Sequence, residues 1–454
     1  MNNVFFWLKR GIKTKRWIFV GVIGIILILI GFNNLLNDLI YIEIRKEYEL
    51  LFILTGVALI LMAVLKLIRN LEENIKSSSS NIFLKASRSP NYIYDRRVLE
   101  RGLKVVVIGG GTGLSVLLRG LKRFTSNITA IVTVADDGGG SGILREDLGM
   151  LPPGDIRNCI LALADTEPIM EKLLQYRFEE GIYKDQNFGN LLIAAMNGIS
   201  DSFEDAIKRI NDIFAVAGKV LPVTVEDITL YAKLENGVII KGESQIPIKS
   251  REWDSPIENV FIKPKKVKPL VEAKESIMDA DVIILGPGSL YTSILPNLIV
   301  EDVTKIIKKS QATKVYVSNV MTQPGETDKY SVGDHVNSIL KHTNARVIEY
   351  VYANNKKIPE EAFYKYQEEG AKPVEIREED EVLFKNNEIK LIQDNFIEVK
   401  KGYVRHDALK LSEFILQMVI NQRYSQDKMR FRELNSIMKK GKKFEKIEEQ
   451  ASEA

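Results

Sequence analysis

Short apolar segments that end in glycine constrain the fold of this chain more than any other feature. Lys104–Ile108 reads KVVVI, and the five residues GGGTG separate it from the helical spacing of LSVLLRGLKRF. Asp281–Leu285 (DVIIL) runs in the same way into GPGSLYTSILPNL. Short β-branched runs are typical of parallel strands buried on both faces, and strands that alternate with helices indicate a doubly wound sheet. We therefore expect an α/β domain with a mainly parallel sheet.

Other segments continue this alternation. Further strands are expected at 128–134, at 314–318 and in RVIEYVY, and helices at 155–164, 168–178, 190–199, 202–214 and near 334–342. The middle of the chain differs, because ITLYAKLENGVIIKGESQI alternates apolar and polar residues around Asn236-Gly237. That pattern predicts a small β-hairpin subregion inserted into the domain or lying at its edge.

Two uncharged runs near the N-terminus are candidates for membrane-spanning helices. The first covers Trp17–Leu36 and the second, slightly shorter, covers Leu50–Leu65; a helix of about 20 apolar residues spans a bilayer. Basic residues cluster before the first run and after the second, which predicts that both ends lie in the cytoplasm. A cleaved secretory signal and a buried helical hairpin of a soluble fold are the alternatives.

These features divide the chain into four parts. We expect a transmembrane hairpin at 1–70, a cytoplasmic linker at 71–102, a nucleotide-binding α/β domain at 103–420 and a charged tail at 421–454. For the tail, a frayed helix or a disordered segment is the simplest expectation. The protein would then be a multi-pass protein of the cell membrane with its main domain on the cytoplasmic side, and we also expect a homo-oligomer.

The composition excludes several classes of function. Lys and Arg number 63 against 60 Asp and Glu, and this near balance argues against a nucleic-acid partner. The single cysteine, Cys159, rules out internal disulfides, and its apolar neighbours predict a buried, unreactive thiol. The three histidines are too scattered in the sequence to suggest a metal cluster.

The first glycine-rich turn, GGGTG, follows the strand at 104–108. Glycines let a ligand approach the backbone, and the N–H groups that begin the next helix favour phosphate. The dinucleotide pattern G-x-G-x-x-G fails here and the Walker lysine is missing, so we expect phosphate binding without NAD. A tight turn that needs small residues only for packing is the alternative. The residues concerned are Gly109, Gly110, Gly111, Thr112 and Gly113.

The second turn begins with two adjacent carboxylates, Asp136 and Asp137, at the end of the strand at 128–134. An acid at this place can accept from ribose hydroxyls, and two acids together can hold Mg²⁺ against phosphates. Alternatively both are solvated turn residues. The glycines that follow form a candidate anion nest, which includes Gly138, Gly139 and Ser141.

Polar residues after this turn and at two further strand ends complete the candidate site. Asp155 could cap the helix at 155–164, and Arg157 could bind a phosphate or Glu146. In the third turn Ser289 could cap a helix, and Tyr291 could stack on a base or belong to the core. Because ligands bind at the carboxyl ends of parallel strands, we expect all these turns to converge on one cleft. The further residues are Asp155, Arg157, Asn158, Asn190, Gly286, Gly288, Ser289, Tyr291, Asn319 and Gln323.

Six motifs in this order resemble those of the bacterial gluconeogenesis factor family, a branch of the 2-phospho-L-lactate transferase-like superfamily. The resemblance covers roughly Lys104 to His406. The chain departs from the family pattern at Gly140, where the family usually has serine, which puts a role for that hydroxyl in doubt. The motifs are VVVIGGGTGLSVLLRGLK, TVADDGG, LREDLGMLPPGDIRNC, NFGNLLIAA, GPGSLYTSILPNL and VMTQPGETD.

The resemblance implies a Rossmann-like fold that binds nucleotides. Members of this branch are similar to proteins that bind UDP-activated sugars, such as UDP-N-acetylglucosamine, and that are needed for cell shape and for growth on gluconeogenic carbon sources. By position, the first glycine turn and the Asp136–Asp137 turn would contact the diphosphate or a metal ion. Asn190 and the GPGSLY loop would complete the nucleotide site.

Two functions remain open at this stage. The first is a membrane-anchored sensor that binds a nucleotide sugar and acts on cell-wall regulatory partners. The second is a transferase that uses a nucleotide-activated donor, like the superfamily's namesake, which acts with magnesium. The spacing of the residues shows no nucleophile arrangement that would decide between them, and the failed dinucleotide pattern disfavours a nicotinamide dehydrogenase.

Overall fold

The computed structural model describes residues 14–31, 46–76, 98–165, 168–400 and 402–452. The chain forms two compact units, Met1–Val98 and Leu99–Ala454. Each unit is described by itself.

The first unit contains two helices, α1 (Thr14–Gly31) and α2 (Lys46–Lys76), which pack against each other. Two glycines face each other at the contact. A Cβ atom on Gly24 would lie 2.8 Å from the carbonyl oxygen of Gly56, and one on Gly56 would lie 2.6 Å from that of Gly24. Small residues that let two backbones approach in this way are typical of paired membrane helices.

The remaining surface of this helix pair is apolar. Phe19 and Leu50 are each 67% exposed and Leu61 is 61% exposed. The stretch Tyr48–Lys66 is long and apolar enough to cross a membrane, whereas the apolar stretch Phe19–Gly31 is shorter. Residues 32–36 of the predicted first span lie outside the described residues, and the membrane location itself stays a prediction.

The second unit is built on a seven-stranded parallel sheet, in the order β10-β9-β8-β7-β1-β2-β3. This confirms the predicted α/β fold with its mainly parallel sheet. Most of the apolar strands are buried along their whole length, as their sequences predict. The strands are β1 (Val105–Gly109), β2 (Ile128–Val132), β3 (Lys219–Pro222), β7 (Val282–Leu285), β8 (Thr313–Val317), β9 (Tyr350–Asn354) and β10 (Lys390–Asp394).

The strand order reverses between β1 and β7. From β1 the chain moves outward to β2 and β3, and it then returns to β7 on the other side of β1 before moving outward to β8, β9 and β10. Such a switch point opens a crevice at the carboxyl ends of the two strands, where doubly wound proteins bind ligands. Here those ends are Gly109 and Leu285.

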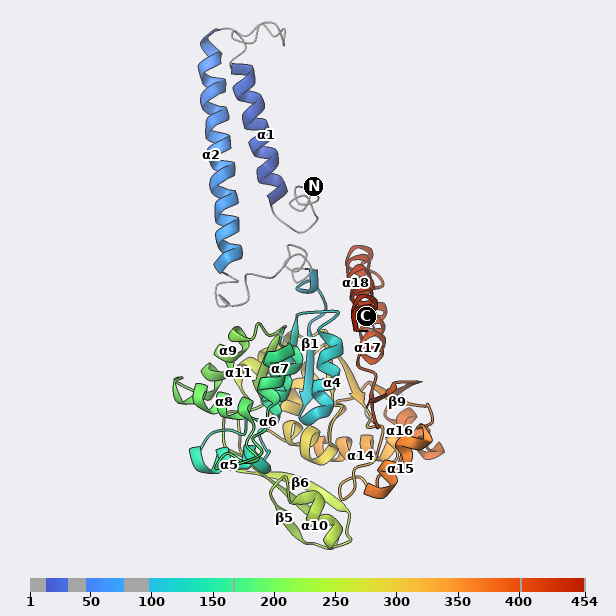
Figure 1. Ribbon diagram of the computed structural model, residues 1–454. Coiled ribbons are helices and arrows are strands. Elements are labelled where there is room, and N and C mark those ends of the chain that lie inside the picture. The colour runs from blue at the N-terminus through green and yellow to red at the C-terminus, as the bar shows by residue number, and fades with distance from the viewer. Residues whose placement is uncertain (1–13, 32–45, 77–97, 166–167, 401, 453–454) are drawn as a thin grey trace. The chain divides into compact units, whose positions relative to one another are not determined.

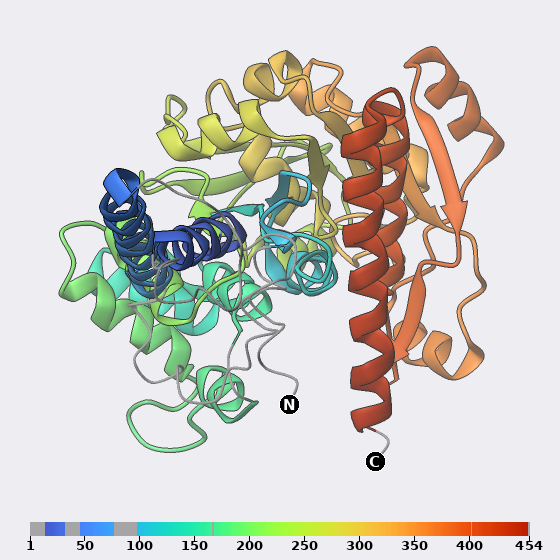
Figure 2. The same cartoon turned by 90° about the horizontal axis from the view of Figure 1, so that it is seen from above.

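Helices cover both faces of the sheet (Figures 1 and 2). Because parallel crossovers are right-handed, α4 (between β1 and β2) and α13 (between β7 and β8) lie on opposite faces. Contacts group α6 and α17 with α4, and α11 and α12 with α13. The helices of this part are α4 (Gly111–Leu121), α5 (Gly139–Leu148), α6 (Gly154–Leu163), α7 (Pro168–Gln175), α8 (Phe188–Gly198), α9 (Phe203–Ile213), α11 (Val271–Asp279), η4 (Leu290–Ile294), α12 (Leu295–Leu298), α13 (Val303–Lys309), α14 (Val332–Thr343), α15 (Glu360–Glu369) and α16 (Glu378–Asn386).

Two small antiparallel sheets complete the domain. The predicted hairpin is confirmed as β4 (Thr229–Leu234) and β5 (Ile239–Lys241), with Gly237 in the turn at φ 88°. Strand β6 (Ile257–Lys263) pairs with the other side of β4, and α10 (Ile246–Glu252) connects β5 to β6. The second sheet pairs β11 (Ile397–Lys400) with β12 (Tyr403–His406).

The C-terminal segment is helical and packed, which differs from the disordered or frayed tail expected from its charge. Helix α17 (Ala408–Tyr424) packs on α4, and α18 (Lys428–Ser452) packs on α17. Leu434, Ile437 and Met438 of α18 are buried. The charged helix has a narrow apolar stripe formed by these residues, and burial of this stripe holds α18 on the domain.

The packing of α18 can be tested with one buried and one exposed residue of the same helix. Ile437→Ala should lower the free energy of unfolding of the domain from Leu99 onward by about 2–4 kcal/mol, because it leaves a cavity in a packed contact. Ser436→Ala, at the neighbouring exposed position, should change the free energy of unfolding by less than about 0.5 kcal/mol. Urea denaturation measures both, and equal values for the two variants would contradict a docked α18.

Candidate functional site at the carboxyl edge of the sheet

The first and third glycine turns pack directly against each other at the switch point. A Cβ atom on Gly113 would lie 2.8 Å from the carbonyl oxygen of Pro287, and one on Gly288 would lie 3.2 Å from that of Gly110. Gly111 has φ 69°, a conformation that favours glycine. The packing alternative therefore accounts for glycine at Gly113 and Gly288; ligand binding at this turn stays a prediction.

Asp155 lies at the N-terminus of α4, where the sequence predicted a phosphate. Its carboxylate accepts a hydrogen bond from the backbone N–H of Gly111, the first residue of that helix. It does not cap its own helix, because the N-cap of α6 is Pro153 and no side-chain cap is formed there. Burial and the nearby Asp136 carboxylate raise the pKa of Asp155 to about 7. This group therefore exchanges protons near neutral pH.

The adjacent carboxylates Asp136 and Asp137 have different partners. Both oxygens of Asp137 accept backbone N–H groups, from Ser244 at 2.9 Å and from Glu243 at 3.2 Å. Asp136 accepts from the N–H of Gly138 at 2.9 Å and from the Ser141 side chain, and burial raises its pKa. Asp137 thus fastens the β5–α10 loop, with Glu243, to the second turn.

The described residues do not form a metal cage. No group of three or more histidine, cysteine, aspartate or glutamate side chains in that part of the chain is placed to hold a metal ion. Asp137 accepts one backbone N–H on each of its carboxylate oxygens, and each oxygen keeps a further lone pair. A magnesium ion at this place would depend on Asp136 and on the ligand's own phosphate oxygens.

A polar network links the predicted residues of the second turn to α6 and α8. The Nδ2 atom of Asn190 lies 3.5 Å from the hydroxyl of Ser141, and its Oδ1 atom accepts from Arg157 at 2.8 Å. Arg157 also donates to Asn158 at 2.9 Å. The structure therefore brings Asp136, Ser141, Asn190, Arg157 and Asn158 into one connected set, as the sequence analysis expected.

Arg157 is a half-buried cation that binds amide oxygens instead of carboxylates. Among the described residues it forms no ion pair, and its buried Nε–H has no acceptor. It does not bind Glu146, the alternative partner named from the sequence. Burial and the neighbouring Arg177 lower its pKa. An unpaired guanidinium beside a second arginine is well suited to an anionic ligand.

The glycine run after Asp137 forms the first turn of α5, which begins at Gly139 with φ 48°; the predicted anion nest would therefore be the N-terminus of this helix. Gly138 is the N-cap. At Gly140, where the family usually has serine, a Cβ atom would lie 2.8 Å from Oε1 of Gln186. That oxygen is buried and has no partner among the described residues. The glycine that this chain has at 140, in place of the family's serine, is thus closely packed against Gln186.

Glu326, which is 4% exposed, joins the third turn to the loop NVMTQPGETD after β8, called the fourth turn. Its carboxylate accepts from the backbone N–H groups of Tyr291 and Thr292, from Thr292 Oγ1 at 3.2 Å and from Gln323 Nε2 at 2.5 Å. Burial raises the pKa of Glu326 to about 7. Gln323 therefore contributes to the site by holding the Glu326 carboxylate. Asn319 is half-buried after β8, and its Oδ1 atom has no partner among the described residues.

Tyr291 belongs to the core, which corrects the stacking role considered for it. It is 1% exposed, and its hydroxyl bonds to Tyr330 at 2.7 Å and to Ser338 at 3.2 Å. Its ring packs edge-on against His342, so neither face is open to a base. The expected cap by Ser289 is also wrong, because its side chain makes no cap hydrogen bond.

Glu243 is a member of the site that the sequence analysis did not find. It follows β5 in the small sheet, and burial together with Asp136, Glu326, Asp155 and Asp137 raises its pKa to about 8. No sequence pattern around GESQ predicts this role, because only the packing of the β5–α10 loop on Asp137 places Glu243 in the site. We call this group of residues the carboxyl-edge site: Asp136, Asp155, Glu243, Glu326 and the network of Arg157 with Asn158, Asn190 and Ser141.

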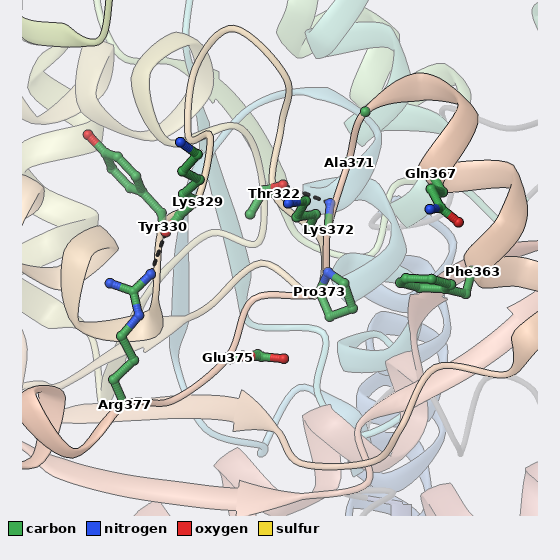
Figure 3. A pocket seen from close by; sticks show the side chains of 11 residues that line it. Thr322, Lys329, Tyr330, Phe363, Gln367, Ala371, Lys372, Pro373, Glu375 and Arg377 are labelled. Carbon is green, nitrogen blue, oxygen red and sulfur yellow. Dashed lines mark hydrogen bonds between the residues drawn. The ribbon is translucent and has the colours of Figure 1, made fainter.

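A cavity of about 400 Å³ opens beyond the fourth turn (Figure 3). Phe363 and Tyr330 line it together with Lys329, Lys372 and Arg377. Arg377 is held by Asp334 at 3.1 Å, whereas the amino groups of the two exposed lysines have no partner among the described residues. Tyr330 joins this cavity to Tyr291. The sequence analysis missed it because its walls come from three separate loops and a helix.

Comparison with known proteins identifies the family. The sequence profile described as 2-phospho-L-lactate transferase CofD matches residues 105–397. A relative from Clostridium acetobutylicum is 46% identical over 97% of this chain and 98% of its own length. The protein named gluconeogenesis factor from Bacillus subtilis is 44% identical over 70% of this chain and 98% of its own. The chain belongs to the gluconeogenesis factor branch of the CofD family.

A solved structure agrees with the fold of this family member. The crystal structure of a UPF0052 family protein from Bacillus halodurans is 47% identical and has a TM-score of 0.66. It covers 69% of this chain and 99% of its own chain. A relative whose chain matches 69% of this one therefore has the same α/β fold.

The raised pKa values predict that the stability of the domain depends on pH. Glu243 has a pKa of about 8 in the folded protein against 4.5 when unperturbed, so the folded state binds more protons between these values. The free energy of unfolding should therefore fall as the pH rises from about 5 to 8.5. Glu243→Gln should flatten this slope and stabilise the ligand-free domain at pH 8.5 by about 1–2 kcal/mol.

Denaturation at a series of pH values measures this effect. Glu252→Gln, an exposed residue at the end of α10, is the matched control and should leave the slope as it is. If Glu243→Gln destabilises the domain equally at every pH, the carboxyl group of Glu243 is not protonated in the folded protein.

Proposed function

We propose that this protein binds a UDP-sugar, such as UDP-N-acetylglucosamine, at the carboxyl-edge site and acts as a regulator of cell shape under gluconeogenic growth. The observation that carries the proposal is Arg157. A half-buried arginine held by Asn190 and Asn158, with an unpartnered Nε–H, is preorganised for an anion. It lies beside the switch point of a doubly wound sheet, where nucleotides are bound.

The acids of the site suit the other parts of such a ligand. Asp155 has a pKa of about 7 and Glu243 of about 8, so near neutral pH each can donate or accept a hydrogen bond. Glu326 is buried and already held by Thr292 and Gln323, so it supports the site from below. Ribose and sugar hydroxyls need both kinds of partner. A fully ionised cluster of four acids would instead repel a diphosphate. The raised pKa values lower the negative charge of the acids and so reduce their repulsion of a ligand that carries a diphosphate.

The cavity beyond the fourth turn offers room for one end of the ligand. Its two unpaired lysines can contact phosphate, and Phe363 offers an aromatic wall. We propose that it receives the part of the nucleotide that Tyr291 was expected to bind. A magnesium ion, if one is bound, would be held between Asp136 and the diphosphate.

The helix pair α1–α2 supports the membrane part of the proposal. Its glycine contact and its exposed apolar surface suit a lipid environment. We propose that it anchors the protein in the cell membrane with the α/β domain in the cytoplasm, where it would meet nucleotide sugars and cell-wall regulatory partners.

A transferase is the second candidate, and one observation favours it. Asp155 has a pKa of about 7, which is suitable for a general base near neutral pH. The matching family profile is also named for a transferase. In this case Asp155 would take a proton from an acceptor hydroxyl that attacks the nucleotide-activated donor.

The ligand proposal predicts a specific loss in one arginine variant. Arg157→Lys should weaken the binding of UDP-N-acetylglucosamine about 10- to 100-fold, because lysine cannot replace the planar fork that bonds both asparagines and the ligand. Arg209→Lys, on the exposed side of α9 and paired with Asp205, should leave the affinity unchanged. Isothermal titration calorimetry of the domain from Leu99 onward measures both.

The same samples separate regulator from enzyme. Incubation with UDP-N-acetylglucosamine followed by chromatography should return the ligand unchanged if the protein is a regulator. Released UDP that disappears in Asp155→Asn would establish the transferase instead. Equal affinity of Arg157→Lys and the parent domain would contradict the assignment of the site.

A further inference from the structure

A row of basic side chains lies on the exposed side of α18. Lys428, Arg432 and Lys439 are all exposed, with Ser436 between the last two. Their spacing of four, four and three residues places them along one side of the helix. None of the three side chains has a hydrogen bond or ion pair with another described residue. These three residues are called the basic row.

Few acids offset the charge of this region. Between residues 428 and 442 the sequence has six lysines and arginines and a single acid, Glu433. That acid is already paired with Arg101 at 3.3 Å and with Arg430 at 3.1 Å. The basic row therefore keeps its full charge, and an anionic partner can be bound without first breaking an internal ion pair.

The basic row lies at the amino edge of the sheet, opposite the carboxyl-edge site. Helix α18 contacts the segments that lead into the first two strands: Arg430 donates to the carbonyl of Arg101 at 3.0 Å, and Gly441 packs on Phe124. Figure 2 looks onto this end of the domain and shows the red helix lying lengthwise across it. The chain also enters the domain at this edge, since Leu99 begins the unit and Val105 begins β1.

We propose that the basic row binds the headgroups of anionic phospholipids and docks the amino edge of the domain on a membrane surface. Charge complementarity and the position of Leu99 support this partner. The apolar helix pair precedes Leu99 in the chain, with residues 77–98 between them. The carboxyl-edge site would then face the cytoplasm. The inference uses the proposed anchoring and is independent of the proposed ligand.

The test uses the full chain with a reporter cysteine. Cys159 is the only cysteine and is buried, so Ser436→Cys can be labelled selectively with an environment-sensitive fluorophore. The labelled protein is reconstituted into vesicles of phosphatidylcholine alone or with about 40% phosphatidylglycerol. Emission should shift to the blue only with the anionic lipid, and about 0.5 M NaCl should reverse the shift because it screens surface charges.

Charge-reversal variants provide the decisive comparison. Lys428→Glu, Arg432→Glu and Lys439→Glu together should lower the ratio of docked to free domain by about a hundredfold or more, since each basic side chain near an anionic surface contributes about fivefold. The control carries the same three reversals at exposed lysines away from α18: Lys265, Lys356 and Lys357. The control should keep the blue shift.

Three outcomes would overturn the proposal: equal emission in both lipids, a blue shift that survives in the basic-row variant, or loss of the shift in the control. Flotation of the vesicles after carbonate extraction reports insertion of the helix pair separately. A protein that fails to insert but still shows the salt-sensitive shift would contradict the anchor and support the basic row. If the protein neither inserts nor shows the blue shift, both the anchor and the basic-row proposal are overturned. The affinity for the nucleotide should stay the same in either case, so these outcomes do not bear on the ligand proposal.

Discussion

The close contact between two turns at the switch point supports the whole functional edge of this protein. Gly113 and Pro287 lie so close that the space for a side chain on Gly113 is taken by the carbonyl of Pro287. This contact joins the carboxyl ends of β1 and β7. It fixes the start of α4, where Asp155 accepts the N–H of Gly111, and the start of η4, where Glu326 accepts two N–H groups. Two helix N-termini thus hold buried acids, each with a pKa raised to about 7.

That arrangement changes what the glycine-rich turns mean for function. Helix N-termini after such turns commonly bind phosphate directly, but here carboxylates occupy both. The available positive charge comes from Arg157 in the neighbouring network and from lysines at the cavity beyond the fourth turn. The protein therefore offers acids for hydroxyls and cations for phosphates in adjacent places. This division fits a nucleotide sugar, whose diphosphate lies between two hydroxyl-rich groups.

Much of this was predictable from the sequence, and the failures have identifiable causes. Local patterns predicted most strands, the hairpin at Asn236-Gly237 and the association of Asp136, Ser141, Asn190 and Arg157. Strand β3 was not predicted because KVLP is short, and α5 was not predicted because its first turn contains glycines. Tyr291 was misjudged because its partners Tyr330 and Ser338 lie far along the chain. Glu243 depends on tertiary packing alone, which no local pattern can reveal.

The central claim is that a nucleotide sugar lies along the carboxyl edge, between Arg157 and the loop after β8. A crystal structure of the domain from Leu99 onward with UDP-N-acetylglucosamine tests it most directly. The account predicts that the diphosphate lies within hydrogen-bonding distance of Arg157 and that Tyr291 stays buried without contact to the ligand. A ligand bound at the amino edge, or one whose diphosphate does not contact Arg157, would contradict it.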